Sequence, residues 1–208
     1  GRRGSINFFL TVKGIQGHTA NANRAENPAH HLITFLHHII SQPLDDGNEY
    51  FLPSSIQIPT FDVGNSAANV IPEIAKATIN IRFNNDHNGE SLQQWLKKHI
   101  SNYFSDIPKV TCTFTSDQIG ESFLTKPSTL SVLVSSACRE MNKTNIDPEL
   151  ATDGGTSDAR FIKDYCEVLE LGLINNTLHQ VDEHVLTDDL HRLHDLYLLI
   201  LEKYFEKA

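Results

Sequence analysis

The 208-residue sequence lacks the features typical of membrane, disulfide-linked or nucleic-acid-binding proteins. No apolar run approaches the roughly 20 residues that cross a bilayer, and the N-terminus has no signal-peptide pattern. The three cysteines form no Cys-x-x-Cys pair, and their odd number disfavours a disulfide framework. A net charge of -9 leaves no basic stripe to displace counterions from phosphates. The sequence therefore predicts a cytoplasmic protein with neither a membrane nor a nucleic-acid partner.

The first half of the chain alternates between strand and helix patterns. Two segments repeat apolar residues at helical spacing, 27–43, which opens with the helix-start pair Asn27-Pro28, and 89–104. Apolar and β-branched stretches predict four strands, at 6–14, 54–63, 73–83 and 109–115. The order β-α-β-β-α-β predicts an α+β unit, an antiparallel sheet with both helices on one face.

The second half has an α/β pattern that is typical of the tail of a larger doubly wound domain. Its predicted elements are a helix at 128–142 capped by Ser128 or Thr129, a Gly-rich turn and short helix at 152–162, a buried strand at 166–173, and a terminal helix at 187–205 capped by Thr187. The sequence begins at Gly1 without a methionine, so we expect it to start inside a longer protein.

Four features carry candidate chemistry, and each has a structural alternative. His18 follows Gly17 in a loop where its ring could meet a ligand, or it is simply an exposed loop histidine. Arg82 in a strand could clamp a carboxylate, or occupy an exposed face. The turn at 153–157 could cradle an anion, or be a Gly-Gly turn capped by a serine. His179 follows the predicted strand at 166–173 and could bind a metal, or lie beside an acidic helix cap.

Several stretches together resemble the M20-type family of co-catalytic zinc peptidases and deacylases. The resemblance extends over essentially the whole chain and is strongest to the branch that acts on succinylated diamino acids. It implies a lid and dimerisation domain at 4–116, with 1–3 and 117–208 forming the C-terminal portion of an α/β catalytic domain. The N-terminal portion of that domain is absent from this sequence. The stretches that carry the resemblance are "GRRGS", "LTVKGIQGHTA", "AENP", "GNEYFLPSSIQI", "NVIPE", "INIRF", "GESFLTKP", "GGTSDARFI" and "NNTLHQVDEHV".

The resemblance also implies a reaction, the hydrolysis of a succinylated diamino acid in lysine and cell-wall precursor synthesis. The intact enzyme would be a homodimer joined through the lid domain, with two zinc ions per subunit and cobalt as an alternative. His179 would be a metal ligand, and His18 would reach the partner's site and donate to the oxyanion of the tetrahedral intermediate. The implied substrate-binding residues are Arg2, Ser5, Asn69, Arg82, Gly155, Thr156 and Asn175.

Two motifs of that family are missing. The chain contains no His-x-Asp and no Glu-Glu pair, which in the family supply metal ligands and the general base. We therefore expect the isolated chain to bind little or no zinc and to be inactive. Two alternatives stay open: another deacylase or carboxypeptidase of the same family, such as an acetylornithine deacetylase, or a dimerisation module without chemistry of its own.

Overall fold

The computed structural model describes residues 1–117 and 119–206. Gln118, Lys207 and Ala208 belong to the predicted C-terminal portion and lie outside the described residues. The chain divides into two compact units. Unit 1 comprises 1–124 and 152–156, and unit 2 comprises 125–151 and 157–208. Unit 1 thus contains the whole of the predicted lid, 4–116, together with short flanking segments; the domain boundaries themselves stay a prediction.

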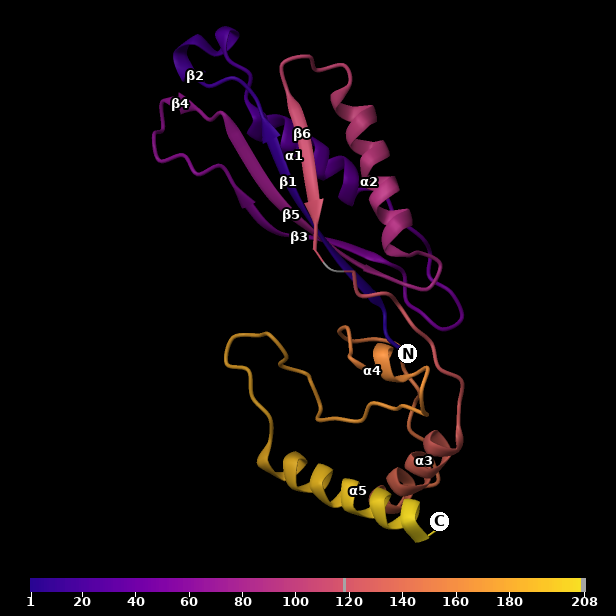
Figure 1. Ribbon diagram of the computed structural model, residues 1–208. Coiled ribbons are helices and arrows are strands. Elements are labelled where there is room, and N and C mark those ends of the chain that lie inside the picture. Colours follow the sequence, from indigo (N-terminus) through magenta and orange to yellow (C-terminus); the bar gives the residue numbers. More distant parts are fainter. Residues whose placement is uncertain (118, 207–208) are drawn as a thin grey trace. The chain divides into compact units, whose positions relative to one another are not determined.

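Unit 1 is built on a four-stranded antiparallel sheet with the strand order β3-β5-β1-β6 (Figure 1). The predicted order of four strands and two helices is confirmed, so the α+β unit forms as expected. The structure adds a ribbon of two-residue strands, β2 and β4, and a 3-10 helix, η1, at one end of the sheet. The elements are β1 (Gly4–Lys13), β2 (Gly17–His18), η1 (Thr19–Arg24), α1 (Pro28–Ile40), β3 (Ser55–Asp62), β4 (Val70–Ile71), β5 (Ile74–Phe83), α2 (Gly89–Phe104) and β6 (Thr111–Ser116).

The core of unit 1 lies between one face of the sheet and the two helices. Alternate residues of β1 and β5 are buried, as the period of two of a strand requires when one face is covered. The apolar stripes of α1 and α2 pack on this face. α1 begins at the predicted Asn27-Pro28 pair, where Asn27 accepts a hydrogen bond from the Ala29 amide. α2 begins at the predicted residue, Gly89, and the structure adds a capping box between Asn88 and Ser91.

The opposite face of the sheet is open and polar. Thr60 donates its hydroxyl to Thr78 at 2.8 Å, and the Asn80 amide donates to the side chain of Asn7 at 2.7 Å. These cross-strand pairs continue to the end of β5, where the open face carries Arg82. One face of the sheet therefore supplies stability, while the other is free to meet a ligand or another surface.

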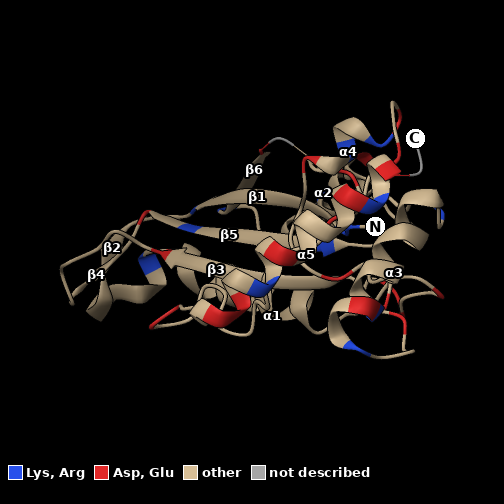
Figure 2. Cartoon of the chain, turned by 90° about the horizontal axis from the view of Figure 1, so that it is seen from below, with Lys and Arg blue, Asp and Glu red and all other residues tan. Residues whose placement is uncertain are grey.

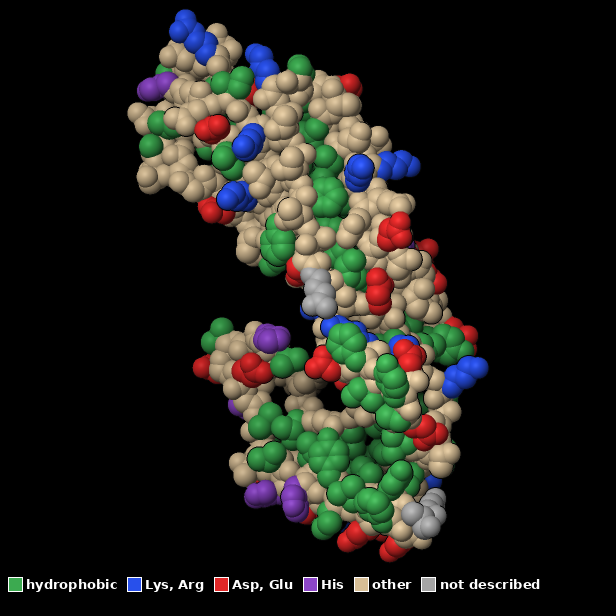
Figure 3. Space-filling view, in the orientation of Figure 1, with side chains coloured by type: hydrophobic (Ala, Val, Ile, Leu, Met, Phe, Trp, Pro, Cys, Tyr) green, Lys and Arg blue, Asp and Glu red, His purple; other side chains and the backbone are tan. Residues whose placement is uncertain are grey.

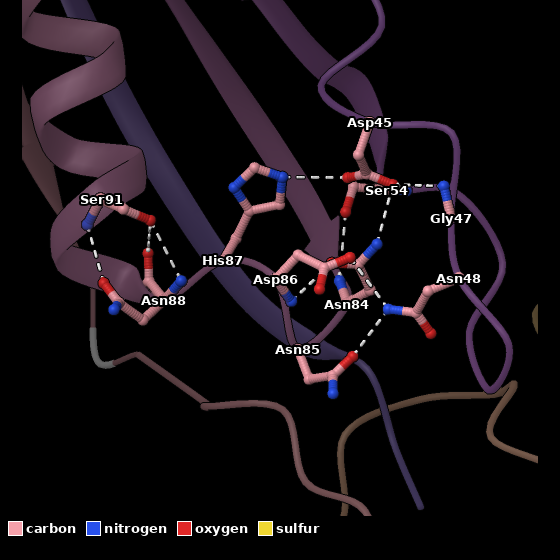
Figure 4. Close-up of polar contacts among 10 residues, drawn as sticks. All are labelled: Asp45, Gly47, Asn48, Ser54, Asn84, Asn85, Asp86, His87, Asn88 and Ser91. Atoms are coloured by element: carbon pink, nitrogen blue, oxygen red, sulfur yellow. Dashed lines mark hydrogen bonds and ion pairs between the residues drawn. The ribbon is translucent and has the colours of Figure 1, made fainter.

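A network of polar contacts links the loop between α1 and β3 to the residues that follow β5 (Figure 4). Its centre is Asp45, whose Oδ1 accepts from the Gly47 amide at 2.8 Å, the Ser54 amide at 3.1 Å and the Asn84 side chain at 2.8 Å. Its Oδ2 lies 3.0 Å from Nε2 of His87. Asn84 is fully buried, so this carboxylate satisfies an amide that water does not reach. The network gives the loop 45–54 one fixed shape.

Unit 2 contains α3 (Thr129–Asn142), α4 (Ala159–Ile162) and α5 (Thr187–Glu206). Ser128 caps α3 through a capping box, as one of the two predicted alternatives requires. Thr187, predicted as the cap of the last helix, is instead the first residue of α5. The small core of this unit consists of Leu133, Val134 and Cys138, with Leu130, Leu169, Leu171, Leu196 and Ile200 packed against it.

The buried strand predicted at 166–173 is wrong. This segment has no regular secondary structure and none of its residues is buried. A strand is held by hydrogen bonds to a neighbouring strand, and none of the described strands pairs with this segment. Its leucines pack on the α3 cluster instead, which explains the apolar sequence without a sheet.

Unit 2 exposes much apolar surface (Figure 3). None of the described residues of α5 is buried, and among its exposed side chains are Leu190, Tyr197, Leu198, Leu201, Tyr204 and Phe205. Contiguous exposed apolar surface of this kind usually packs against another element. No described helix is both long enough and apolar enough to cross a bilayer. Basic and acidic residues are interspersed over both units in the view of Figure 2, without a continuous basic stripe.

Candidate substrate-binding site

The candidate site begins with Arg82, near the end of β5 on the open face of the sheet. In the sheet register, Arg82 pairs with Ser5 of β1 on one side and with Ser55 of β3 on the other. The strand period places all three side chains on the same face, because the residues before and after Arg82 point into the core. A guanidinium flanked by two short hydroxyl side chains is an arrangement suited to a carboxylate.

The guanidinium of Arg82 is short of partners. Its Nη1 atom is buried and has no hydrogen-bond partner among the described residues, and the same is true of Nε of Arg3. Burial, followed by the positive charge of Arg3, lowers the pKa of Arg82 below its ordinary value. Arginine remains charged in proteins, so the two cations repel each other without a counterion. An anion bound between them would relieve both the repulsion and the unmade hydrogen bonds.

Arg2 is held by the Gly-rich segment. Its Nη1 donates to the carbonyl oxygen of Asp153, and Gly154 has a φ of +94°, where a side chain would be strained. A Cβ on Gly154 would lie 2.6 Å from Arg2 Nη1, so the glycine permits the close approach. The hydroxyl of Thr152 donates to the carbonyl of Tyr50, in the loop that the Asp45 network fixes.

The structure therefore gathers most of the predicted substrate-binding residues at one end of unit 1. Arg2, Ser5 and Arg82 lie at the β1 start and β5 end, and Gly155 and Thr156 belong to the segment that contacts Arg2. Both Gly155 and Thr156 are exposed.

His18 lies at the opposite end, in the short β2–β4 ribbon, where it pairs with Val70. The ring is exposed, and its Nδ1 accepts a hydrogen bond from the Ala20 amide at 3.0 Å. A neutral imidazole that accepts at Nδ1 carries its hydrogen on Nε2, which is thus a donor directed away from the loop. Asn69 lies beside it, because its carbonyl accepts from the Thr19 amide at 3.0 Å.

The two ends of the sheet are too far apart to contact one small molecule. β1 and β5 pair from Gly4 with Phe83 to Lys13 with Ile74, and at roughly 3.4 Å for each of these steps the ends are about 30 Å apart. Figure 1 shows β2 and β4 beyond one end of the sheet, away from the β5 end. Even fully extended, the five steps from Lys13 at the end of β1 to His18 span only about 18 Å. His18 and Asn69 therefore cannot share a substrate with Arg82 of the same chain.

The two remaining predicted residues, Asn175 and His179, belong to unit 2. Both are exposed, and His179 has a φ of +59°, a left-handed conformation that is uncommon outside glycine. The loop around it is closed by Thr177, whose hydroxyl donates to the carbonyl of His184 at 2.8 Å and accepts from its amide at 3.1 Å. Strained residues held by such bonds often mark functional positions.

The described residues do not form a zinc site by themselves. They contain no group of three or more histidine, cysteine, aspartate or glutamate side chains that could hold a metal ion. Zinc takes three or four protein ligands, and of the predicted set this chain offers only His179. The three cysteines are free, and burial raises the pKa of Cys112 to about 12, which keeps that thiol protonated and unsuited to bind a metal.

Arg3 and the Asp45 network were not predicted from the sequence. Arg3 could have been found, since it lies two residues before Ser5 and a continued strand alternation puts both side chains on the open face. Asp45 carries no such signal, because two of its partners, Asn84 and His87, lie about 40 residues further along the sequence.

Known proteins resemble the chain over almost its whole length. Residues 1–108 match the M20 peptidase dimerisation domain. The succinyl-diaminopimelate desuccinylase of Paracoccus denitrificans is 48% identical over 205 residues, which are 99% of this chain and 53% of that protein. The enzyme of the same name from Ehrlichia canis is 46% identical, over 99% of this chain and 52% of its own length. The chain thus spans about half the length of the curated relatives it matches.

Solved structures of distant relatives have the same fold. The di-peptidase Dug1p from Saccharomyces cerevisiae matches with a TM-score of 0.80 at 15% identity, over 99% of this chain and 55% of that one. Human carnosine dipeptidase 1 matches with a TM-score of 0.75 at 15% identity, over 97% and 55%. The family match covers more than half of the chain and the fold agrees with it. The chain belongs to the M20 peptidase family, whose dimerisation domain occupies residues 1–108.

Proposed function

We propose that this chain is the dimerisation domain and C-terminal catalytic portion of a succinyl-diaminopimelate desuccinylase. The reaction would hydrolyse the amide of N-succinyl-diaminopimelate to succinate and diaminopimelate, a step of lysine biosynthesis. Relatives of that name, 43–48% identical over 99% of this chain, support the substrate class. The single structural observation that carries the proposal is the pair of buried nitrogens on the open face of the sheet, Nη1 of Arg82 and Nε of Arg3, which have no hydrogen-bond partner among the described residues.

The succinylated substrate matches this guanidinium pair because it is rich in carboxylates. One carboxylate placed against Arg82 would accept from Nη1, which has no partner now, and from the neighbouring hydroxyl of Ser5. A charge-assisted hydrogen bond to this half-buried guanidinium would be worth about 1.5–3 kcal/mol, enough for roughly 10–100-fold discrimination against a substrate that lacks the carboxylate. This favours a succinyl over an acetyl substrate, because the acetyl group carries no carboxylate.

His18 would act in the site of the partner subunit. The separation of about 30 Å between the two ends of the sheet argues against its action beside Arg82 of its own chain. Its Nε2 donor, oriented by the Ala20 amide, suits the developing oxyanion of an attacked amide. Removal of one such donor typically lowers kcat about 10²–10³-fold.

The homodimer would use α1 and the edge strand β3. Ile33 and Ile40 lie two turns apart on α1 and are 54% and 51% exposed. Their flank of the helix faces away from α2, since His38 on the other flank contacts α2. β3 pairs with β5 along one edge only, and an unpaired edge readily joins another strand. A two-fold axis would bring both features of one subunit against the same features of its partner.

Zinc dependence is part of the proposal. His179 would supply one imidazole, and the remaining ligands and the general base would come from residues that this chain does not contain. The exposed apolar surface of α5 would then be covered by the rest of the catalytic domain. By itself the chain would be inactive. We further propose a cytoplasmic location, in line with free cysteines and a biosynthetic substrate.

The test is a comparison of substrates on the protein that carries this chain, prepared at its natural length with zinc. N-succinyl-diaminopimelate should be hydrolysed at least tenfold more efficiently than N-acetylornithine, and Arg82→Lys should reduce that preference. A preference for the acetylated substrate would instead identify a deacetylase of the same family. If the protein forms dimers without zinc and hydrolyses neither substrate, it would be identified as a dimerisation module.

A further inference from the structure

Two histidines outside the candidate site join the helices of unit 1. Nε2 of His38 on α1 lies 3.2 Å from Nδ1 of His99 on α2, and the ring centroids are 5.3 Å apart. His38 is exposed and His99 is half-buried, so the pair is open to solvent on one side. Trp95, one turn before His99, contacts the His99 ring with centroids 4.7 Å apart. Nothing in the proposed hydrolysis uses these side chains.

We propose that His38 and His99 chelate a divalent transition-metal ion of the Ni²⁺ and Cu²⁺ group. Imidazole nitrogen binds these ions at about 2.0–2.1 Å. The ligand–metal–ligand angles of square-planar and tetrahedral coordination, about 90° and 109°, then separate the two nitrogens by about 2.9–3.3 Å. The separation of 3.2 Å lies in that interval. The backbone already holds the rings at chelating distance, and small rotations of the side chains would direct both lone pairs at one ion.

The chemical state of the pair also suits a metal. Neutral imidazole is the metal-binding form, and burial, followed by the charges of His38 and Lys98, lowers the pKa of His99 below 6.5. Each neutral ring has a single N–H, so the hydrogen shared in the present contact would move to the other nitrogen of its own ring. The charge of Lys98, which also acts on His99, opposes binding, whereas the Gln42 side chain, 3.4 Å from the His38 ring, is neutral.

Water would complete the coordination shell. The described residues offer no third histidine, cysteine or carboxylate to this pair. A site with two protein ligands and open positions holds an exchangeable ion, unlike the closed four-ligand sites that build a fold. The ion would still link α1 to α2, so it would bind the folded unit more tightly than the unfolded chain and raise its stability.

The single tryptophan of the chain gives a site-specific assay. Cu²⁺ is titrated into the 208-residue chain at pH 7.5 in a non-coordinating buffer, and the fluorescence of Trp95 is recorded. An ion at His99 would lie next to the indole and quench it. We expect saturable quenching, which His38→Gln shifts to at least about tenfold higher Cu²⁺ concentration.

His38→Gln leaves the His99–Trp95 contact in place, so a shift reports lost chelation and not a changed indole environment. His37→Gln, at the neighbouring exposed histidine of α1, is the matched control and should quench like the unaltered chain. Equal quenching curves for His38→Gln and the unaltered chain, or no saturation below about 1 mM Cu²⁺, would overturn the proposal.

Discussion

Replacement of Asp45 tests the claim that one carboxylate fixes the loop between α1 and β3. Its side chain is 13% exposed and accepts from Gly47, Ser54 and Asn84 while contacting His87. In Asp45→Ala these donors lose their acceptor. A buried donor left unsatisfied costs about 1–3 kcal/mol, and water can reach some of the four, so we expect unit 1 to lose about 2–4 kcal/mol.

Asp45→Asn is the matched variant. Its carbonyl oxygen can keep the three contacts made by Oδ1, and only the ion pair with His87 is lost, so we expect a cost of about 1 kcal/mol. Burial raises the pKa of Asp45, but hydrogen bonds from Ser54 and Gly47 and the charge of His87 outweigh it, and the pKa is lowered from 3.8. The charge therefore stabilises the fold above pH 3.8 and this contribution is lost as pH falls through the lower folded-state pKa. The difference in the free energy of unfolding between the unaltered chain and Asp45→Asn should therefore shrink as the pH falls through that range.

The assay is urea unfolding followed by the fluorescence of Trp95, which lies in α2 and reports on unit 1 alone. The free energy of unfolding is compared at pH 7 and at stepwise lower pH for the unaltered chain and both variants. An Asp45→Ala protein within about 0.5 kcal/mol of the unaltered chain would refute the reasoning, because that is the range of ordinary surface changes.

The remaining predictions concern the Gly-rich segment and the dimer. Gly154→Ala should destabilise unit 1 by at least about 1–2 kcal/mol, because φ of Gly154 is +94° and the new Cβ would lie 2.6 Å from Nη1 of Arg2. Gly155→Ala should be nearly neutral, because no atom lies within 4 Å of the position of its new Cβ. Thermal unfolding of the two variants decides this, and equal losses would contradict it. Ile33→Asp should convert dimers to monomers in light scattering after size-exclusion chromatography, and Thr34→Asp, on the same helix, should not. Dimers that survive Ile33→Asp would place the interface elsewhere.

The architecture of unit 1 could be predicted from the sequence because local signals and burial agree there. β1 and β5 alternate apolar and polar residues, and the burial pattern of the sheet follows the same alternation. The helix start predicted at Asn27-Pro28 appears in the structure as a cap, with the Asn27 side chain accepting from the Ala29 amide. Arg82 was identified for the same reason, since a charged residue in an alternating strand must lie on the uncovered face.

Features that depend on distant partners could not be predicted. The β2–β4 ribbon has two residues in each strand, too few for a periodic signal. The segment 166–173 has the composition of a strand, but pairing decides strand formation and the described residues offer it no partner strand. The buried nitrogens of Arg82 and Arg3 that lack a hydrogen-bond partner among the described residues are a property of the folded sheet. The fold brings together two cations that the sequence separates by almost 80 residues.

The central claim is that His18 and Arg82 of one chain serve different active sites, because the sheet holds them about 30 Å apart. The most direct measurement mixes two inactive variants of the natural-length enzyme, His18→Ala and Arg82→Ala, and assays hydrolysis of N-succinyl-diaminopimelate after subunit exchange. In each mixed dimer one site would receive an intact Arg82 from its own subunit and an intact His18 from the partner. With random exchange, half of the dimers are mixed and about a quarter of the wild-type activity should return. Activity that stays at the level of the separate variants, although mixed dimers form, would contradict the account.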